Sequence, residues 1–217
     1  LDEQGAPGGQ IYKGVEKVFA DRPQDIRPLG REYAEGKTLT RRFRQSGARY
    51  QPGVSVWQIT SDQEPDLALG LIENGSARML HPKHVILATG AMERPTPFEG
   101  WTLPGVMTVG AAQTLLKSSR LLPEDDVVLA GTGPLLYLYV MQRKKFGIRP
   151  QAILDTGPPL SLRTSLLGLR ALITCPQAMF QGMRWLWGAG VKTNMTRGVD
   201  SLKAQGGDHL SSVSYEA

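Results

Sequence analysis

The residues with the clearest chemical potential lie in the stretch GTGPLL, residues 131 to 136, and in an acid that follows it. An apolar run leads into the two glycines and a helical pattern leads out. Gly131 can therefore make a tight turn, and Gly133 can let a pyrophosphate approach the backbone at Pro134, where a helix N-terminus offers free N–H groups. Asp155 closes the next apolar run, AILD, about 20 residues on, where a carboxylate bonds a ribose 2′-hydroxyl and repels a 2′-phosphate. The pattern predicts a nucleotide site that favours NAD(H) over NADP(H).

The third position of this glycine motif departs from the usual pattern. Leu136 stands where close packing of helix on strand favours Gly or Ala. A purely structural turn, or a site for a different nucleotide, is therefore the alternative interpretation.

The elements that must position this turn are read from apolar periodicity. GVSVWQIT, LALGLIE and ARMLHPKHVILATG are strand-like, with the turn signal Asn74-Gly75 between the last two, and they predict a meander ending in a buried strand, VILA. From residue 104 strands and helices alternate. Helices are expected at KTLTRRFRQSGARY, GAAQTLLKSSRLL, TSLLGLRALIT and QAMFQGMRWLWGAG, a parallel strand–turn–helix–strand unit at 125–157, and paired strands after residue 190. The polar stretch before Gly36 has no clear pattern, and the first three residues have the character of a strand end.

Composition limits the function classes. The 217 residues are 41% hydrophobic, enough for a core, and a single Cys, Cys175, excludes an intrachain disulfide and a CxxC motif and favours a cytoplasmic setting. No apolar run is long enough to span a bilayer. The net charge of +5 and the basic segment at 37–49 would suit a polyanion. Because the sequence has no recognisable nucleic-acid-binding fold, we expect this segment to be a solvated helix face or to contact the phosphate of a bound nucleotide, and we expect no nucleic-acid partner.

Several stretches together resemble a known group of flavoproteins. ILATGAMERPTPFEGWTLPGVMTVGAAQTLLK, then VVLAGTGPLLYL, taken with the opening LDEQGAPGGQIY, are similar to two-dinucleotide-binding-domain proteins. The similarity is specifically to the flavin subunit of opine oxidases, hydrogen cyanide synthase and dye-linked amino acid dehydrogenases. The resemblance implies an α/β fold in which a Rossmann-like FAD domain, here residues 1–103 and partial, is interrupted by a second Rossmann-like NAD(P)-binding domain, here residues 104–217.

The resemblance also assigns binding residues. Glu3 would bond the adenosine ribose, the PGGQ loop would pass the flavin pyrophosphate and ring, Val56 or Trp57 would meet adenine through the backbone, and the ATGA turn would lie near the flavin. The FAD residues so assigned are Glu3, Gly8, Gly9, Gln10, Val56, Thr89, Gly90 and Ala91, and those for NAD(H) or another nucleotide are Gly131, Gly133, Pro134 and Asp155.

The chain departs from that pattern in three places. The phosphate-binding GxGxxG expected roughly 20 residues before Glu3 is not in the sequence, nor is the returning FAD segment, so we expect a fragment that lacks both ends and is inactive and poor at binding FAD alone. The missing CxxC disfavours disulfide reduction. No catalytic residue can be assigned, and the scattered His81, His84 and His209 predict no metal site.

Two functional hypotheses follow. The first is a part of an FAD-dependent oxidoreductase subunit that oxidises an amino acid, opine or related amine, or relays electrons with a second subunit of a hetero-oligomer. The second is a non-catalytic nucleotide-binding or assembly module without flavin chemistry. Upstream coding sequence for a strand and GxGxxG would favour the first, and tight NAD(H) or ATP binding without flavin the second.

Overall fold

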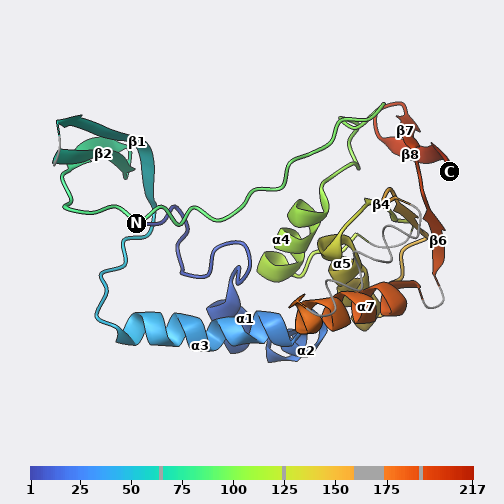
Figure 1. Cartoon of the computed structure of the whole chain (residues 1–217), viewed down its shortest axis with the longest axis horizontal. Helices are drawn as coiled ribbons and strands as arrows, with labels where there is room; N and C mark the ends of the chain where they lie inside the picture. Colours follow the sequence, from blue (N-terminus) through green and yellow to red (C-terminus); the bar gives the residue numbers. More distant parts are fainter. Residues whose placement is uncertain (64–65, 124–125, 159–173, 191–192) are drawn as a thin grey trace. The chain divides into compact units, whose positions relative to one another are not determined.

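The computed structural model describes the chain except residues 64–65, 124–125, 159–173 and 191–192. It divides into two compact units, Leu1–Met92 and Glu93–Ala217, each described by itself below. Figure 1 follows the elements along the chain. The predicted division into a partial FAD domain at 1–103 and a second nucleotide domain at 104–217 stays a prediction.

The first unit begins with short helices in the stretch that had no clear pattern. They are α1 (Val15–Asp21), the 3-10 turn η1 (Pro23–Asp25), α2 (Ile26–Leu29) and the longer α3 (Arg31–Gln45). Val15, Val18, Leu29 and Tyr33 are buried in it, and the Tyr33 hydroxyl donates to the Lys13 carbonyl at 2.7 Å. Helices this short take their stability from packing rather than from their own sequence, which is why their periodicity was too weak to read. The helix predicted at 37–50 is confirmed for residues 37–45, the C-terminal part of α3, whereas residues 46–50 lie beyond the helix end.

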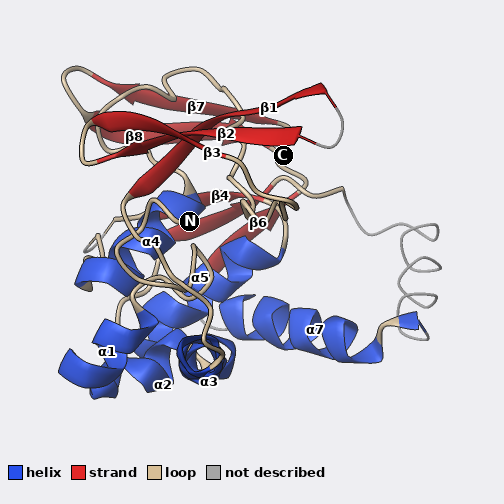
Figure 2. Cartoon of the chain, turned by 90° about the vertical axis from the view of Figure 1, so that its left-hand side faces the viewer, coloured by secondary structure: helices blue, strands red, loops and turns tan. Residues whose placement is uncertain are grey.

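A three-stranded antiparallel meander follows, as predicted. It contains β1 (Val54–Gln63), β2 (Asp66–Glu73) and β3 (Ser76–Leu80) in the order β1-β2-β3, side by side in Figure 2. Asn74 and Gly75 join β2 to β3 with φ of 52° and 76°, the left-handed pair that a tight hairpin needs. Val54, Leu69 and Leu71 form a small buried cluster on one face.

The predicted buried strand VILA is wrong. Residues 84–98 have no regular secondary structure, and Ile86 and Leu87 are 90% and 72% exposed. Only Val85 packs against the cluster of the meander. The segment pairs with none of the described strands. Its backbone therefore forms no strand-to-strand hydrogen bonds with them, and its other apolar side chains are not covered by a sheet. The opening residues likewise form one isolated bridge, Asp2 to Pro52, rather than a strand end.

The second unit contains a parallel sheet with helices, as the alternating pattern predicted. Its elements are α4 (Val109–Ser119), β4 (Val128–Gly131), α5 (Pro134–Lys145), β5 (Ala152–Asp155), α7 (Pro176–Gly190) and β6 (Asn194–Arg197). The three strands pair in parallel in the order β4-β5-β6. The strand–turn–helix–strand prediction at 125–157 is therefore confirmed, and the chain has a mixed helix-and-sheet fold. The finer Rossmann-like assignment stays a prediction.

Helix α5 is largely buried and is hydrogen-bonded to the C-terminal end of α7. Leu136, Tyr139 and Val140 of α5 are buried, as are Ile153 and Leu154 of β5. α5 and α7 lie side by side (Figure 1), and Lys144 Nζ donates to the carbonyls of Gly188 and Ala189 at 2.9 and 2.6 Å. A lysine at the negative end of a helix dipole stabilises that end.

The C-terminal strands were predicted to pair with one another, but they belong to two different sheets. β7 (Ser201–Gly206) and β8 (Leu210–Glu216) are an antiparallel hairpin, whereas β6 joins β5 in parallel. The helix predicted at 164–174 lies, apart from Thr174, outside the described residues. Of the helices that are described, none has the length and apolar character to cross a membrane.

Candidate nucleotide sites

The turn between β4 and α5 has the backbone conformation that its glycines predict. Gly131 and Gly133 have φ of 134° and 100°, values that only glycine adopts readily, and Pro134 occupies the first turn of α5. No described atom lies within 4 Å of where a Cβ would stand on either glycine. The α5 N-terminus therefore carries amide groups beside backbone that a ligand can approach closely. Leu136, the departure from the motif, is 3% exposed and lies in the interior instead of over the turn.

Asp155 lies directly beside this turn, since β5 pairs Asp155 with Gly131. Its carboxylate is engaged at both oxygens: Tyr137 donates its hydroxyl to Oδ2 at 2.6 Å, and the Gly157 backbone N–H donates to Oδ1 at 2.9 Å. Burial, followed by the hydrogen bond and the charge of Asp155, raises the pKa of Tyr137, while Arg197 opposes that rise. Sequence reasoning missed Tyr137, although its place in the first turn of the helix after the glycines, with an acid closing the next strand, is a usable signal.

The N-terminal loop approaches the start of β1. Asp2 bridges Pro52, and Ser55 Oγ donates to Glu3 Oε1 at 2.6 Å. Gly8 has a φ of 135°, and a Cβ on it would lie 2.6 Å from the Tyr12 carbonyl oxygen, so this position needs glycine. Gly9 is also left-handed at 53°, and Gln10 is exposed. Both glycines of the PGGQ loop therefore have a positive φ.

Val56 and Trp57 lie at a register shift in β1, where the pairing moves from Val56 to Gln58. Trp57 is 56% exposed, and its indole lies over Gly70, where an added Cβ would come within 2.6 Å of the ring. Ser55, which bonds Glu3, directly precedes this register shift. An acid and an exposed aromatic surface are thus held at the same end of β1.

The ATGA residues Thr89, Gly90 and Ala91 are exposed and lie in the segment without regular structure. Among the described residues no hydrogen bond joins them to the Glu3 loop. Gly90 has a φ of 73°, and just beyond it Glu93 accepts a hydrogen bond from the Gly110 N–H at 2.6 Å, in the first turn of α4. The Thr108 hydroxyl accepts from Ala111 N at 3.3 Å at the same helix end. Glu93 therefore caps the N-terminal end of α4.

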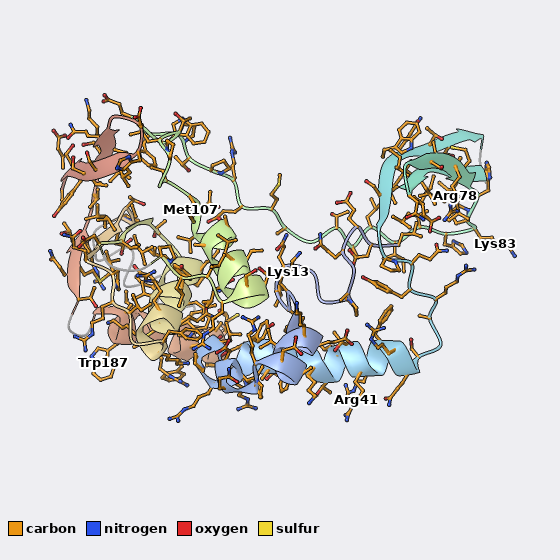
Figure 3. All side chains as sticks on the ribbon, turned by 180° about the vertical axis from the view of Figure 1, so that it is seen from behind. Lys13, Arg41, Arg78, Lys83, Met107 and Trp187 are labelled. Atoms are coloured by element: carbon orange, nitrogen blue, oxygen red, sulfur yellow. The ribbon has the colours of Figure 1, made fainter. Side chains whose placement is uncertain are left out.

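The basic residues of the segment 37–49 that belong to α3 are exposed, as expected, and Arg49 lies beyond the helix end. Arg44 donates to both carboxylate oxygens of Glu16 at 2.6 and 2.7 Å, a pairing that lowers the pKa of Glu16. Lys37 Nζ lies 4.3 Å from the centre of the Phe19 ring. Arg41 projects from α3 in Figure 3, beside a shallow surface cavity of about 470 Å³. Across the described part of the chain, no cluster of His, Cys, Asp and Glu could hold a metal ion.

Several known proteins are similar to this chain. The A subunit of opine oxidase from Rhizobium meliloti (strain 1021) is 39% identical over 189 residues, covering 86% of this chain and 40% of that protein. The corresponding opine oxidase chain of Agrobacterium tumefaciens (strain Ach5) is 38% identical over 219 residues, covering 99% of this chain and 43% of the relative. Hydrogen cyanide synthase subunit HcnB of Pseudomonas aeruginosa is 31% identical over 190 residues, covering 86% of this chain and 38% of the relative.

The predicted resemblance to these subunits is confirmed. The chain spans about 40% of the length of the relatives that it matches. No family model matches it.

Among solved structures, L-proline dehydrogenase from P. horikoshii matches with a TM-score of 0.54 and 18% identity, over 71% of this chain and 29% of that one. At this identity the match shows a shared fold alone.

Proposed function

We propose that this chain is part of an FAD-dependent oxidoreductase subunit that oxidises an amino acid, an opine or a related amine, or relays electrons with a partner subunit. The similarity to the A subunit of opine oxidase, at 38% identity over 99% of the chain, carries the proposal. The shared fold with an L-proline dehydrogenase supports it. Flavin bound here would accept a hydride from the carbon of a C–N bond, while the protein binds and orients the reactants.

The FAD contacts are proposed at the residues that the resemblance assigned. Glu3 would accept hydrogen bonds from the adenosine ribose, with its carboxylate oriented by Ser55. Gly8 and Gly9 would let the backbone approach the pyrophosphate, beside Gln10, and their left-handed φ values support this role. Val56 would meet adenine through its backbone, and the ATGA turn would lie near the flavin. The partial FAD domain at 1–103 contains all of these residues.

A second nucleotide site is proposed at Gly131, Gly133, Pro134 and Asp155. The open backbone at the two glycines and the helix N-terminus beside them support it. NAD(H) or another nucleotide would bind there, within the proposed NAD(P)-binding domain at 104–217.

A second protein subunit is the proposed partner. The names of the relatives from opine oxidase and hydrogen cyanide synthase each denote one subunit of an assembly and support it. A cytoplasmic location is proposed because the chain has one cysteine, and Cys175 is a free thiol.

The test is flavin binding by the protein encoded by the complete reading frame that contains these residues. Purified with excess FAD, it should carry a stoichiometric flavin band, and anaerobic addition of opines or amino acids should bleach that band. Glu3→Gln should weaken FAD binding about tenfold, because a charge-assisted hydrogen bond to the ribose is lost. Glu35→Gln, at an exposed acid on α3, is the control and should bind normally. Tight nucleotide binding without any flavin would support a non-catalytic module and refute the proposal.

A further inference from the structure

The Asp155 carboxylate is hydrogen-bonded to other groups of the same unit. Both of its oxygens accept hydrogen bonds from within the unit, and the residue is 8% exposed. The donors come from different elements, because Tyr137 belongs to α5 and Gly157 follows β5. The Asp155 carbonyl also accepts from Val199 N at 3.1 Å. Since little of the carboxylate faces solvent, its capacity to accept further bonds from a ribose is small.

Arg197 is a charged residue that faces solvent at this edge. β6 ends at Arg197, which pairs in register with Asp155, so the two residues lie at the carboxyl ends of adjacent parallel strands. Arg197 is exposed and lines a surface cavity of about 490 Å³ together with Met183, Leu186, Trp187 and Met195. Trp187 is 78% exposed on α7 and is labelled in Figure 3. The described wall of this cavity is therefore apolar and aromatic with one cation.

The charge of Arg197 acts on the same hydroxyl group as Asp155 does, that of Tyr137. Burial raises the pKa of Tyr137, whose hydroxyl bonds Asp155, and the positive charge of Arg197 opposes that rise. A guanidinium presents several donors in a fixed fork that matches phosphate oxygens. The Asp155 oxygens already accept bonds from Tyr137 and Gly157, so the carboxylate has less capacity than an open one to bind a ribose hydroxyl. Ligands of open parallel sheets bind beyond the carboxyl ends of the strands, which is where Arg197 lies.

We propose that Arg197, and not Asp155, is the charged group that meets a nucleotide at this edge, so that the site prefers an adenosine bearing a 2′-phosphate over one with a free 2′-hydroxyl. The inference rests on the proposed second nucleotide site and reverses the preference that the acid alone suggests. In it, Tyr137 is a positioning residue that retains the carboxylate within the fold. Arg197 donates hydrogen bonds to the phosphate oxygens.

The experiment compares two probes, ADP-ribose and ADP-ribose 2′-phosphate, titrated calorimetrically into the full-length protein. The wild type should bind the 2′-phosphate probe about tenfold more tightly, and Arg197→Gln should abolish that preference. Arg184→Gln, which removes the same charge from an exposed position of α7 outside the cavity lining, should keep it. Tyr137→Phe frees one carboxylate oxygen and should narrow the preference by strengthening ADP-ribose binding.

Three results would overturn the inference: tighter binding of ADP-ribose by the wild type, a preference that survives Arg197→Gln, or an unchanged preference in Tyr137→Phe. Failure of both probes to bind would overturn the second nucleotide site together with it. The flavin content of the same sample, read from its visible spectrum, tests the FAD proposal separately, so the two failures are distinguishable.

Discussion

Lys117 is a lysine held inside the second unit, and its replacement should change how stability depends on pH. The residue is 5% exposed on α4, and its Nζ donates to Gln113 Oε1 at 2.9 Å. Gln113 Nε2 in turn donates to Gln142 Oε1 of α5 at 3.1 Å. Burial lowers the pKa of Lys117 from 10.5 to about 8.

The sign and size of the effect follow from this lowered pKa. Below about pH 8 the lysine is charged in both folded and unfolded chains, and the folded state bears the full cost of burying the charge. Above that pH the folded chain loses the proton first, so the unfolding free energy rises with pH. A tenfold change in a proton-binding constant corresponds to about 1.4 kcal/mol, so the gain between pH 8 and 10 is on the order of 2 kcal/mol. Tyr33 and Tyr50, whose pKa values burial raises to about 12, titrate above this window.

The assay is urea unfolding of the wild type and of Lys117→Met at about pH 7 and about pH 10, followed by circular dichroism and tryptophan fluorescence. The wild type should gain about 2 kcal/mol over the variant between these pH values, and Lys117→Met should be the more stable protein at the lower pH. Lys145→Met, at an exposed lysine of α5, is the matched control and should retain the wild-type pH dependence. If Lys117→Met and the wild type changed in parallel with pH, the reasoning would be refuted.

Three further predictions concern single contacts. Tyr137→Phe should lower the unfolding free energy by about 1.5–3 kcal/mol, because it removes a hydrogen-bond donor from a buried carboxylate. Denaturant melts of the wild type and the variant measure this loss. Gly70→Ala should displace the Trp57 indole and shift its emission wavelength, because an added Cβ would collide with the ring. The emission of Trp57 is obtained by subtracting the spectrum of the Trp57→Phe variant. Glu93→Gln should destabilise α4 by about 0.5–1 kcal/mol, seen as a lower melting temperature; no change would exclude the proposed cap.

Local sequence was sufficient where a turn needs a backbone conformation that few residue types adopt. Gly131 and Gly133 predicted a turn between a strand and a helix, and Asn74-Gly75 predicted a hairpin, because positive φ at these positions leaves few alternatives. Each of these features is decided within a few residues of chain. The PGGQ loop, in contrast, was assigned only through the resemblance to known flavoproteins.

What escaped prediction depends on partners distant in sequence. The VILA run has strand composition, but a strand also needs a neighbour to pair with, and composition does not supply that information. The bond between Tyr137 and Asp155 joins residues 18 apart through the crossover of α5, so it appears only once the parallel unit is built. Arg197 lies beside Asp155 through strand pairing alone. Which charged group a ligand would meet was thus set by tertiary structure.

The unpaired segment that contains VILA is also a site where a protease can cleave the chain. Residues 86–97 are all exposed, and they include the boundary between the two units at Met92 and Glu93. Every described strand pairing lies wholly before the segment, in β1 to β3, or wholly after it, in β4 to β8. A protease that cleaves beside exposed Ile, Leu or Met residues would meet accessible backbone here and break no ladder by cutting. Limited proteolysis would then yield two fragments, each with its own sheets intact. The difference between the melting temperature of each fragment and that of the uncut chain would measure how far each unit stabilises the other.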